Sequence, residues 1–470
     1  MTQLHDLTLT DLAAGLAAKR FSSREIVDAL LARIGKADGK LHAFTEVYAK
    51  EARALADAAD TARGSGFPLG PLHGLPIAYK DLCDIAGRIG TGGSRMFAGR
   101  VATETSNTVE RLTAAGMVPL GKLHMVEFAF GGWGTNPLMG APWNPWDLQV
   151  HRVPGGSSSG TGVAVAARLA PAGIGSDTGG SVRIPSAFNG LVGLKVTFGR
   201  IGLSGTILLS WSLDSIGPMA RSVEDCALLL NALAAPDPRD PTTLGQPLED
   251  FTLATRPGSI EGMRVALPDA AQMPEFLHPD VARAWQAAAR TFEELGANVE
   301  AVRLPDWYFD LSRPAGTIIS SEAYSLHRAY IEDMGQPIGP GVRMRAQAAK
   351  SLAAGAYPEE MRVLEQRRRA FADWFHRYDA ILMPTVGVPA IPLGEVDEAS
   401  PIPGYLTRPA NYLGLCGLAM PAGQSAAGLP VGVQIIGKPF AESDVLRLGK
   451  AFQDATDFHE RSPDLSALGL

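Results

Sequence analysis

The stretch GIGSDTGGSVRIPS, residues 173–186, decides how the rest of this sequence is interpreted. It places a carboxylate, a Gly-Gly pair, a serine and an arginine within seven positions, from Asp177 to Arg183. Glycine allows close backbone approach and positive φ angles, so successive N–H groups in such a loop can converge on an anion. The stretch therefore predicts an anion-binding loop, and Ser181 is either a nucleophile beside it or a serine of the turn.

A second segment rich in glycine and serine, VPGGSSSGTG, spans residues 153–162. The residues between the two segments, VAVAARLAPA, are small and apolar on all sides and predict a buried helix that fixes their relation. Neither segment continues into the GK[ST] of a phosphate-binding P-loop. A nucleophile elbow centred on Ser158 would need a strand directly before it, and no strand pattern is present there. The phosphate-loop and elbow patterns are therefore incomplete, and a phosphate or an oxyanion stays open as the anion that these segments bind.

Lys80 ends the apolar run GLPIAYK. An amine drawn into a poorly solvated site has a lowered pKa, so it can stay neutral and act as a base. A lysine whose ammonium group reaches solvent from a strand end explains the same pattern. From this residue alone, both interpretations remain open.

Composition and charge limit the functional classes. With 46% hydrophobic and 19% charged residues among 470, the chain has the composition of a globular protein that fills one large α/β domain or two domains. The formal net charge of −7 gives no electrostatic reason to expect a nucleic acid or an anionic membrane as partner. The predicted partners therefore exclude both.

Cysteine usage and the N-terminus predict a cytoplasmic protein. Three widely spaced cysteines, with no CxxC grouping, fit reduced thiols better than a disulfide framework or a zinc site. The first residues lack the basic and apolar regions of an export signal. His124 and Glu127 have the spacing of one helical turn but no further ligand pattern, so no metal is predicted.

The order of patterns predicts α/β organisation. Residues 1–65 read as helices, since Thr8 and Ser22 each precede an acidic residue by three positions. Residues 70–240 alternate short apolar runs with turns and helical segments, 265–380 form a variable and partly helical cap or pocket wall, and 380–470 return to the sheet. The uncharged residues 409–437 are divided by prolines and glycines, which predicts buried strands, PVGVQIIG among them, and not a membrane-spanning helix.

Five blocks in this order resemble the amidase signature family. They are GLPIAYKDL, VPGGSSSGTGVAVAA, GIGSDTGGSVRIPSAFNGLVGLKVTFGRI, SLDSIGPMARSVEDCALLL and GLPVGVQIIGKPF. The resemblance covers most of the chain and is weakest between about 240 and 375. It implies a single large α/β domain over residues 1–470, with a central twisted mixed sheet flanked by helices.

The resemblance also assigns catalytic roles. Ser181 matches the family's nucleophile, Ser157 the bridging serine held by a cis peptide bond, and Lys80 the terminal base. No cofactor is implied. The remaining site residues that the resemblance implies are an oxyanion hole at Thr178, Gly179, Gly180 and Ser181, a loop-holding pair Asp177 and Arg183, and pocket-lining residues Phe130, Gly131, Gly132 and Trp133.

Three functions remain open from the sequence. The preferred one is a free-standing amidase, expected to act on a small carboxamide or an N-substituted amide such as an anilide, and to form a homodimer as many members do. The second is the glutaminase component of a tRNA-dependent amidotransferase, which needs a B-type partner. Members of that group commonly carry glutamine where this chain has Ile184, which favours the first function and a less polar substrate. The third is a ligand-binding protein that retains the fold without catalysis.

Overall fold

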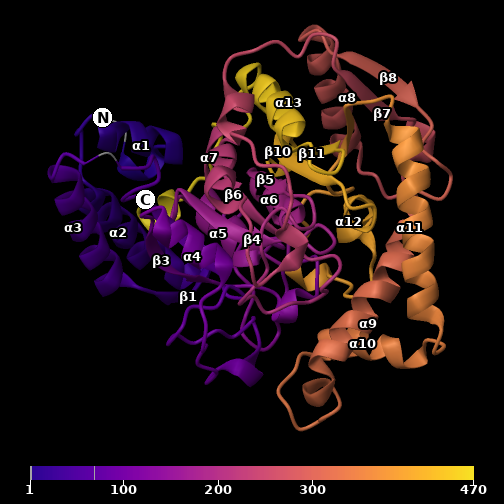
Figure 1. Cartoon of the computed structure of the whole chain (residues 1–470), viewed down its shortest axis with the longest axis horizontal. Helices are drawn as coiled ribbons and strands as arrows, with labels where there is room; N and C mark the ends of the chain where they lie inside the picture. The colour runs from indigo at the N-terminus through magenta and orange to yellow at the C-terminus, as the bar shows by residue number, and fades with distance from the viewer. Residues whose placement is uncertain (1–2, 68) are drawn as a thin grey trace.

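The computed structural model describes residues 3–67 and 69–470. Eleven strands in the described residues form one mixed sheet in the order β1-β3-β2-β4-β6-β5-β10-β11-β9-β7-β8, with helices packed around it (Figure 1). This is the predicted single α/β domain. The strands are β1 Phe44–Val47, β2 Pro76–Lys80, β3 Val118–Leu123, β4 Ala172–Ser176, β5 Val192–Lys195, β6 Ile216–Ala220, β7 Arg264–Pro268, β8 Asn298–Val302, β9 Ala380–Pro384, β10 Cys416–Gln424 and β11 Pro430–Gly437.

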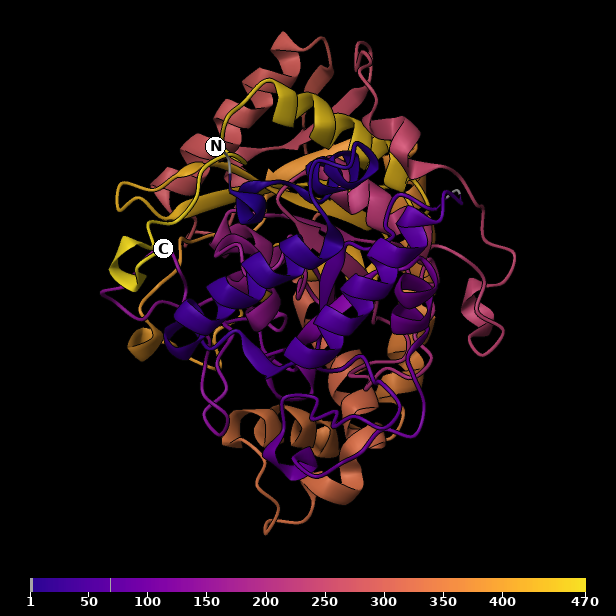
Figure 2. The ribbon, with the colours of Figure 1, turned by 90° about the vertical axis from the view of Figure 1, so that its left-hand side faces the viewer.

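The helices begin with three that lie together at the N-terminal end and face the viewer in Figure 2. The first two start at the predicted capping boxes, Thr8 with Asp11 and Ser22 with Glu25. The helices are α1 Leu9–Ala17, α2 Ser23–Leu41, α3 Ala49–Gly64, α4 Asn107–Ala114, α5 Ser159–Ala166, α6 Arg183–Asn189, α7 Val223–Leu233, α8 Pro279–Glu294, α9 Ser312–Ile331, α10 Pro340–Gln347, α11 Ala356–Phe375, α12 Arg408–Tyr412 and α13 Glu442–Asp454.

The pairing of β2 with β4 determines where the two glycine-rich loops meet. These neighbouring strands are parallel, with Ala78 opposite Gly173 and Tyr79 opposite Ile174. Parallel strands end at the same edge of a sheet, so Lys80, the last residue of β2, lies beside Ser176, the last residue of β4. The loop before α5 and the loop between β4 and α6 therefore share this edge.

The helix between the two loops is buried along its whole length, as predicted. Its boundaries differ from the prediction: α5 begins within the serine run at Ser159 and ends at Ala166. The end comes early because Arg168 adopts a positive φ of 58°, which a continuing helix cannot include.

The C-terminal segment returns to the middle of the sheet. PVGVQIIG is strand β11, buried at every position, and it pairs antiparallel with β10. The uncharged segment thus begins within the short helix α12 and continues as the predicted buried strands, joined by a turn. In the part of the chain that the structure describes, no helix combines the length and apolar character needed to cross a membrane.

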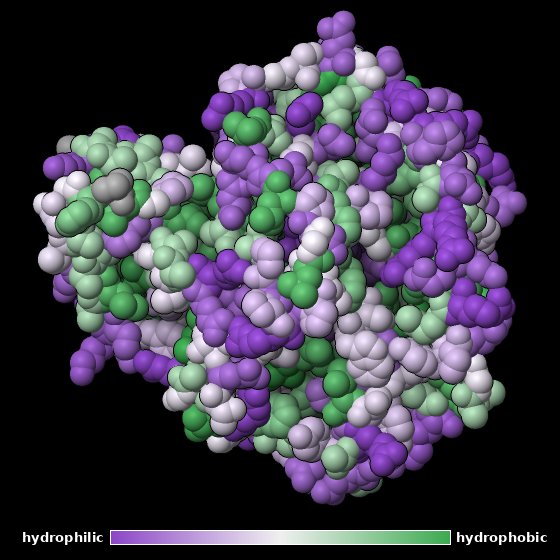
Figure 3. All heavy atoms as spheres, viewed as in Figure 1, coloured by the Kyte–Doolittle hydropathy of each residue, from purple (hydrophilic) through white to green (hydrophobic). Residues whose placement is uncertain are grey.

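Helices α9, α10 and α11 lie between β8 and β9 in the sequence, and in Figure 1 they occupy the right and lower right of the molecule. Helix α11 carries ion pairs of Arg362 with Glu359 and of Arg368 with Glu365 on its surface. The right-hand edge of the surface in Figure 3, where Figure 1 places α11, is correspondingly hydrophilic.

Candidate active site

Lys80 and Ser157 are in direct contact at the shared edge of β2 and β4. The lysine Nζ lies 2.7 Å from the Ser157 Oγ and 2.8 Å from the Ser176 Oγ, and all three side chains are buried. The Gly156–Ser157 peptide bond is cis, the form that the family resemblance implies. Ser176 was not singled out from the sequence, although it lies within the stretch GIGSDTGGSVRIPS. Its role as a neighbour of the lysine depends on the register of β2 against β4.

Burial changes the protonation of Lys80. Desolvation lowers the pKa of this lysine to about 7, and the negative charge of Asp214 opposes the shift without reversing it. Asp214 was not singled out from the sequence either. Burial raises the pKa of Asp214 to about 6, while its carboxylate accepts hydrogen bonds from the Thr178 hydroxyl and from the backbone N–H groups of Leu209 and Ser210. A neutral lysine amine is therefore available near neutral pH.

Ser181 lies in the loop between β4 and α6. It is 7% exposed and lines a cavity, so a small molecule can reach its hydroxyl. The two serine loops are adjacent, because the backbone N–H of Ser158 donates to the carbonyl O of Ser181 at 3.3 Å. Across the described residues, no hydrogen bond joins the Ser181 and Ser157 hydroxyls. The structure thus joins Lys80 to Ser157 and places Ser181 in the neighbouring loop, open to the cavity.

The backbone amides of this loop differ in whether their N–H groups already donate a hydrogen bond. The N–H of Gly180 donates to the Asp177 Oδ1 at 2.7 Å, so that amide is already occupied. The N–H groups of Thr178, Gly179 and Ser181 have no acceptor in the described part of the chain. Three of the four predicted oxyanion donors are therefore free to bind a ligand.

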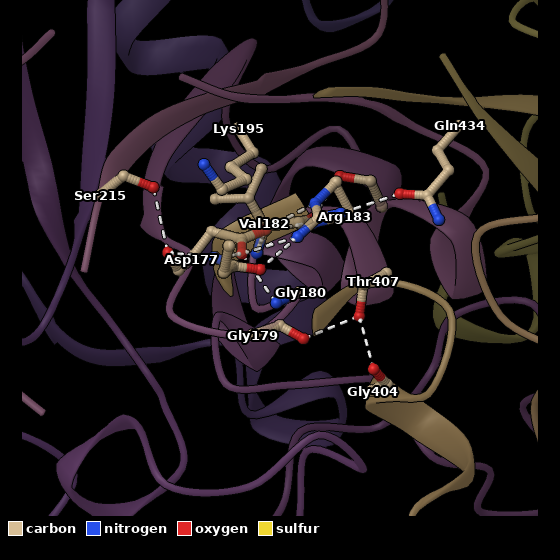
Figure 4. A network of polar contacts seen from close by, with 12 residues as sticks. Asp177, Gly179, Gly180, Val182, Arg183, Lys195, Ser215, Gly404, Thr407 and Gln434 are labelled. Atoms are coloured by element: carbon tan, nitrogen blue, oxygen red, sulfur yellow. Dashed lines mark hydrogen bonds and ion pairs between the residues drawn. The ribbon is translucent and has the colours of Figure 1, made fainter. Parts of the chain in front are cut away.

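A buried ion pair fixes the same loop (Figure 4). The Arg183 Nε and Nη2 donate to the two oxygens of Asp177, each at 3.0 Å, and both side chains are fully buried. Burial opposes ionisation of Asp177, but the Arg183 guanidinium outweighs it and holds the pKa of the carboxyl below its ordinary value. Arg183 also donates to Gln434 on β11 and to Asn411 on α12, at 2.8 and 2.7 Å. The loop is therefore anchored to strands and helices from the distant C-terminal segment.

The cavity beside Ser181 has a volume of about 70 Å³. Phe130, Gly131, Gly132 and Trp133 all line it, which is where the family resemblance puts them. Trp133 is only 4% exposed, and its Nε1 donates to a backbone carbonyl at 3.1 Å. The Trp133 ring is therefore held in a fixed position in the wall of the cavity.

Three charged residues in the same cavity were missed from the sequence. Arg345 belongs to α10, Glu398 to the loop after β9, and Arg408 is the first residue of α12. The Arg345 Nη1 donates to the Glu398 Oε2 at 2.9 Å. Arg345 lies in the section where the family pattern is weakest and Glu398 and Arg408 outside the five blocks, so no motif marked them.

Comparison with known proteins identifies the family. The model of a family described as Amidase matches residues 25–446. The chain belongs to the amidase family. Its relatives include the A component of the glutamyl-tRNA(Gln) amidotransferase of Azotobacter vinelandii, which is 41% identical over 98% of this chain and 100% of the relative.

Solved amidase-family structures agree with this fold. An enzyme of s-triazine catabolism, from a vestigial protein complex, has a TM-score of 0.89 and 34% identity, over 96% of this chain and 98% of that one. The peptide amidase from Stenotrophomonas maltophilia has a TM-score of 0.85 and 31% identity, over 97% and 98%. The predicted family and fold are confirmed, and the chain is a hydrolase of the amidase family.

Two predictions are wrong. The preferred function was a free-standing amidase for small or N-substituted amides, and the predicted partners were a small amide and no nucleic acid. The curated relatives that this chain matches from end to end are instead subunits of an amidotransferase that acts on glutamyl-tRNA(Gln).

The two errors have separate reasons, one in the structure of the cavity and one in the use of net charge. Ile184, which from the sequence indicates a less polar substrate, is buried on one wall of the cavity. The other lining groups include Arg345, Glu398 and Arg408, so one apolar side chain does not describe the cavity. The net charge was equally uninformative, because it averages the whole surface and does not describe any one part of it.

Proposed function

We propose that this chain is the glutaminase subunit of a glutamyl-tRNA(Gln) amidotransferase, which releases ammonia from glutamine for transfer to the tRNA-bound glutamate. The observation that carries the proposal is the 41% identity to such a subunit over the full length of that relative. The contact of a buried lysine with the Ser157 hydroxyl supports it, since amide hydrolysis needs a base that is neutral at the working pH. We place the reaction in the cytoplasm, where aminoacylated tRNA is used.

The first half of the reaction forms an acyl-enzyme. The Ser181 hydroxyl passes its proton to Ser157, and Ser157 passes its own proton to neutral Lys80. The Ser181 Oγ attacks the carbon of the glutamine side-chain amide, and the C=O electron pair moves onto oxygen. When the tetrahedral intermediate collapses, the C–N bond breaks and the nitrogen takes the proton back through Ser157, so ammonia leaves.

The free amides of the loop stabilise the intermediate. The N–H groups of Thr178, Gly179 and Ser181 donate to the oxygen that becomes negative, and each such donor typically contributes about 2.7 to 4 kcal/mol. Water then attacks the ester and gives its proton to the same relay, which restores Ser181 and releases glutamate. The Asp177–Arg183 ion pair acts indirectly, by holding the loop in position.

The test uses the assembled enzyme with its other subunits. Glutaminyl-tRNA formation is measured from glutamyl-tRNA(Gln), ATP and either glutamine or ammonium chloride as nitrogen source. The Ser181→Ala assembly should lose amidation with glutamine and keep amidation with ammonium, because the substitution removes only the step that frees ammonia. Ser186→Ala is the matched control, since the hydroxyl of this buried serine donates only to the backbone carbonyl of Val182.

Two results would count against the proposal. One is an assembly in which Ser181→Ala still uses glutamine as well as the unmodified chain does. The other is an unmodified chain that supports no amidation with glutamine in any assembly while it turns over neutral amides on its own.

A further inference from the structure

Arg408 reaches the active-site cavity across two glycines. A Cβ atom at Gly179 would lie 3.0 Å from the Arg408 Cγ, and one at Gly404 would lie 2.8 Å from the Arg408 Nε. Ser181 and Arg408 both line the same cavity. The absence of side chains at the two glycines is therefore what lets the arginine stem lie against the oxyanion loop.

The residue before Arg408 ties its backbone to that loop. The Thr407 Oγ1 donates to the carbonyl O of Gly179 at 2.7 Å and lies 3.4 Å from the carbonyl O of Gly404 (Figure 4). Helix α12 therefore begins at a fixed place beside the amides of the oxyanion loop. The position of Arg408 relative to Ser181 is set by the fold and does not depend on a flexible surface loop.

The guanidinium of Arg408 has no protein anion to neutralise it. Throughout residues 3–67 and 69–470, it makes no ion pair and no hydrogen bond. The other cation of the cavity is already engaged, because Arg345 pairs with Glu398 and also donates to the carbonyl O of Phe130. Burial lowers the pKa of Arg408, and the charge of Arg345 adds to the shift, so the site disfavours an uncompensated cation.

We infer that Arg408 binds a carboxylate carried by the amide substrate, so the enzyme selects carboxamides that bear a free carboxylate. The inference rests on the proposed function, because glutamine is such a carboxamide. An arginine fork and a carboxylate form two parallel charge-assisted hydrogen bonds, which fix orientation as well as position. The bound carboxylate holds the amide carbon against Ser181, and a neutral amide leaves the guanidinium unpaired.

The test separates binding from turnover. Calorimetry measures the affinity of the Ser181→Ala protein for glutaramate, which is glutamine without its amino group, and for pentanamide, which also lacks the carboxylate. Glutaramate should bind at least about 30-fold more tightly, since truncating one partner of a desolvated charge pair costs about 2 kcal/mol or more. Arg408→Met added to this protein should abolish the difference, and Arg408→Lys should restore part of it.

The controls keep the result interpretable. Arg290→Met removes an exposed arginine on α8 and should leave both affinities unchanged. Retained pentanamide binding in the Arg408→Met protein shows that the cavity is still formed. Equal affinity for the two ligands in the Ser181→Ala protein would overturn the inference, as would an undiminished preference for glutaramate after Arg408→Met.

The inference and the proposed function fail in different ways. If glutamine supports tRNA amidation with an unchanged KM in the Arg408→Met assembly, the carboxylate site is wrong and the function stands. If glutaramate binding depends on Arg408 but glutamine never supplies nitrogen for tRNA, the carboxylate site stands and the function is wrong.

Discussion

The pH dependence of glutamine hydrolysis should follow the protonation of Lys80. Burial lowers the pKa of this lysine from its ordinary 10.5 to about 7, so the amine is mostly protonated below neutral pH and mostly neutral above it. Only the neutral form accepts the proton from Ser157. The neutral fraction is roughly 0.1 at about pH 6 and roughly 0.9 at about pH 8, so kcat/KM should rise about tenfold between them and then level off.

Asp214 provides the perturbation that tests the cause of this profile. Its negative charge favours the protonated form of Lys80, so Asp214→Asn should lower the lysine pKa further and move the acid limb of the profile to lower pH. Asp225→Asn is the matched control. It also changes a fully buried carboxylate, but Asp225 accepts its hydrogen bonds from the backbone N–H groups of Leu9 and Thr10 and from the Thr10 hydroxyl, all on α1.

The assay follows glutamate formation by chromatography, which avoids coupling enzymes with their own pH dependence. Circular dichroism at each pH confirms that the protein remains folded. A profile that is flat between about pH 6 and 8, or one that keeps rising above about pH 9 as an ordinary lysine would require, refutes the assignment of Lys80 as the base. An acid limb that stays in place in Asp214→Asn refutes the electrostatic coupling between these two groups.

Two substitutions test the support of the loop. Gly180→Ala should lower kcat by at least about 100-fold, because its Cβ would lie 2.2 Å from the Thr407 Oγ1 and displace the oxyanion donors. Gly245→Ala is the control, since Gly245 also has a positive φ but has open space around it, and it should keep full activity in the same assay of glutamate formation. Arg183→Met should lower the free energy of unfolding in urea by about 3 to 5 kcal/mol, because it leaves the Asp177 carboxylate buried without its cation. A free energy of unfolding within about 1 kcal/mol of that of the unmodified protein would show that the ion pair contributes little.

The loops and the strand end that form the candidate site were predictable from the sequence because their patterns are local. The glycine-rich loops, the small apolar helix between them and the apolar strand ending in Lys80 each carry a short-range pattern. The resemblance of five such blocks to one family then predicts the fold that contains all of them. The contact of Lys80 with Ser176 was not predictable, because it depends on which strands are neighbours and in which register.

The substrate side of the cavity was predicted only in part. The residues from Phe130 to Trp133 lie in a segment that resembles a family loop, so they were found. Arg345, Glu398 and Arg408 lie outside every block and, taken together, span tens of residues along the chain. Charged residues in such segments normally face bulk solvent, and only the packing of α10 and α12 shows that these line the cavity.

The proposed chemistry and the proposed selectivity therefore reside in different parts of the chain. The proposed base, relay and nucleophile lie at the ends of β2 and β4 and beside α5, all between Lys80 and Ser181. The charged groups that line the cavity come from residues 345–408, on α10, a loop and α12. A change in the second segment can alter which amide binds without moving the first, provided that Thr407 and Gln434 still hold the oxyanion loop. This division explains how a peptide amidase and a component of an amidotransferase can both be similar to this chain along almost its whole length. It also means that Arg408, and not the serine–lysine set, is where exchange of residues should first change the substrate.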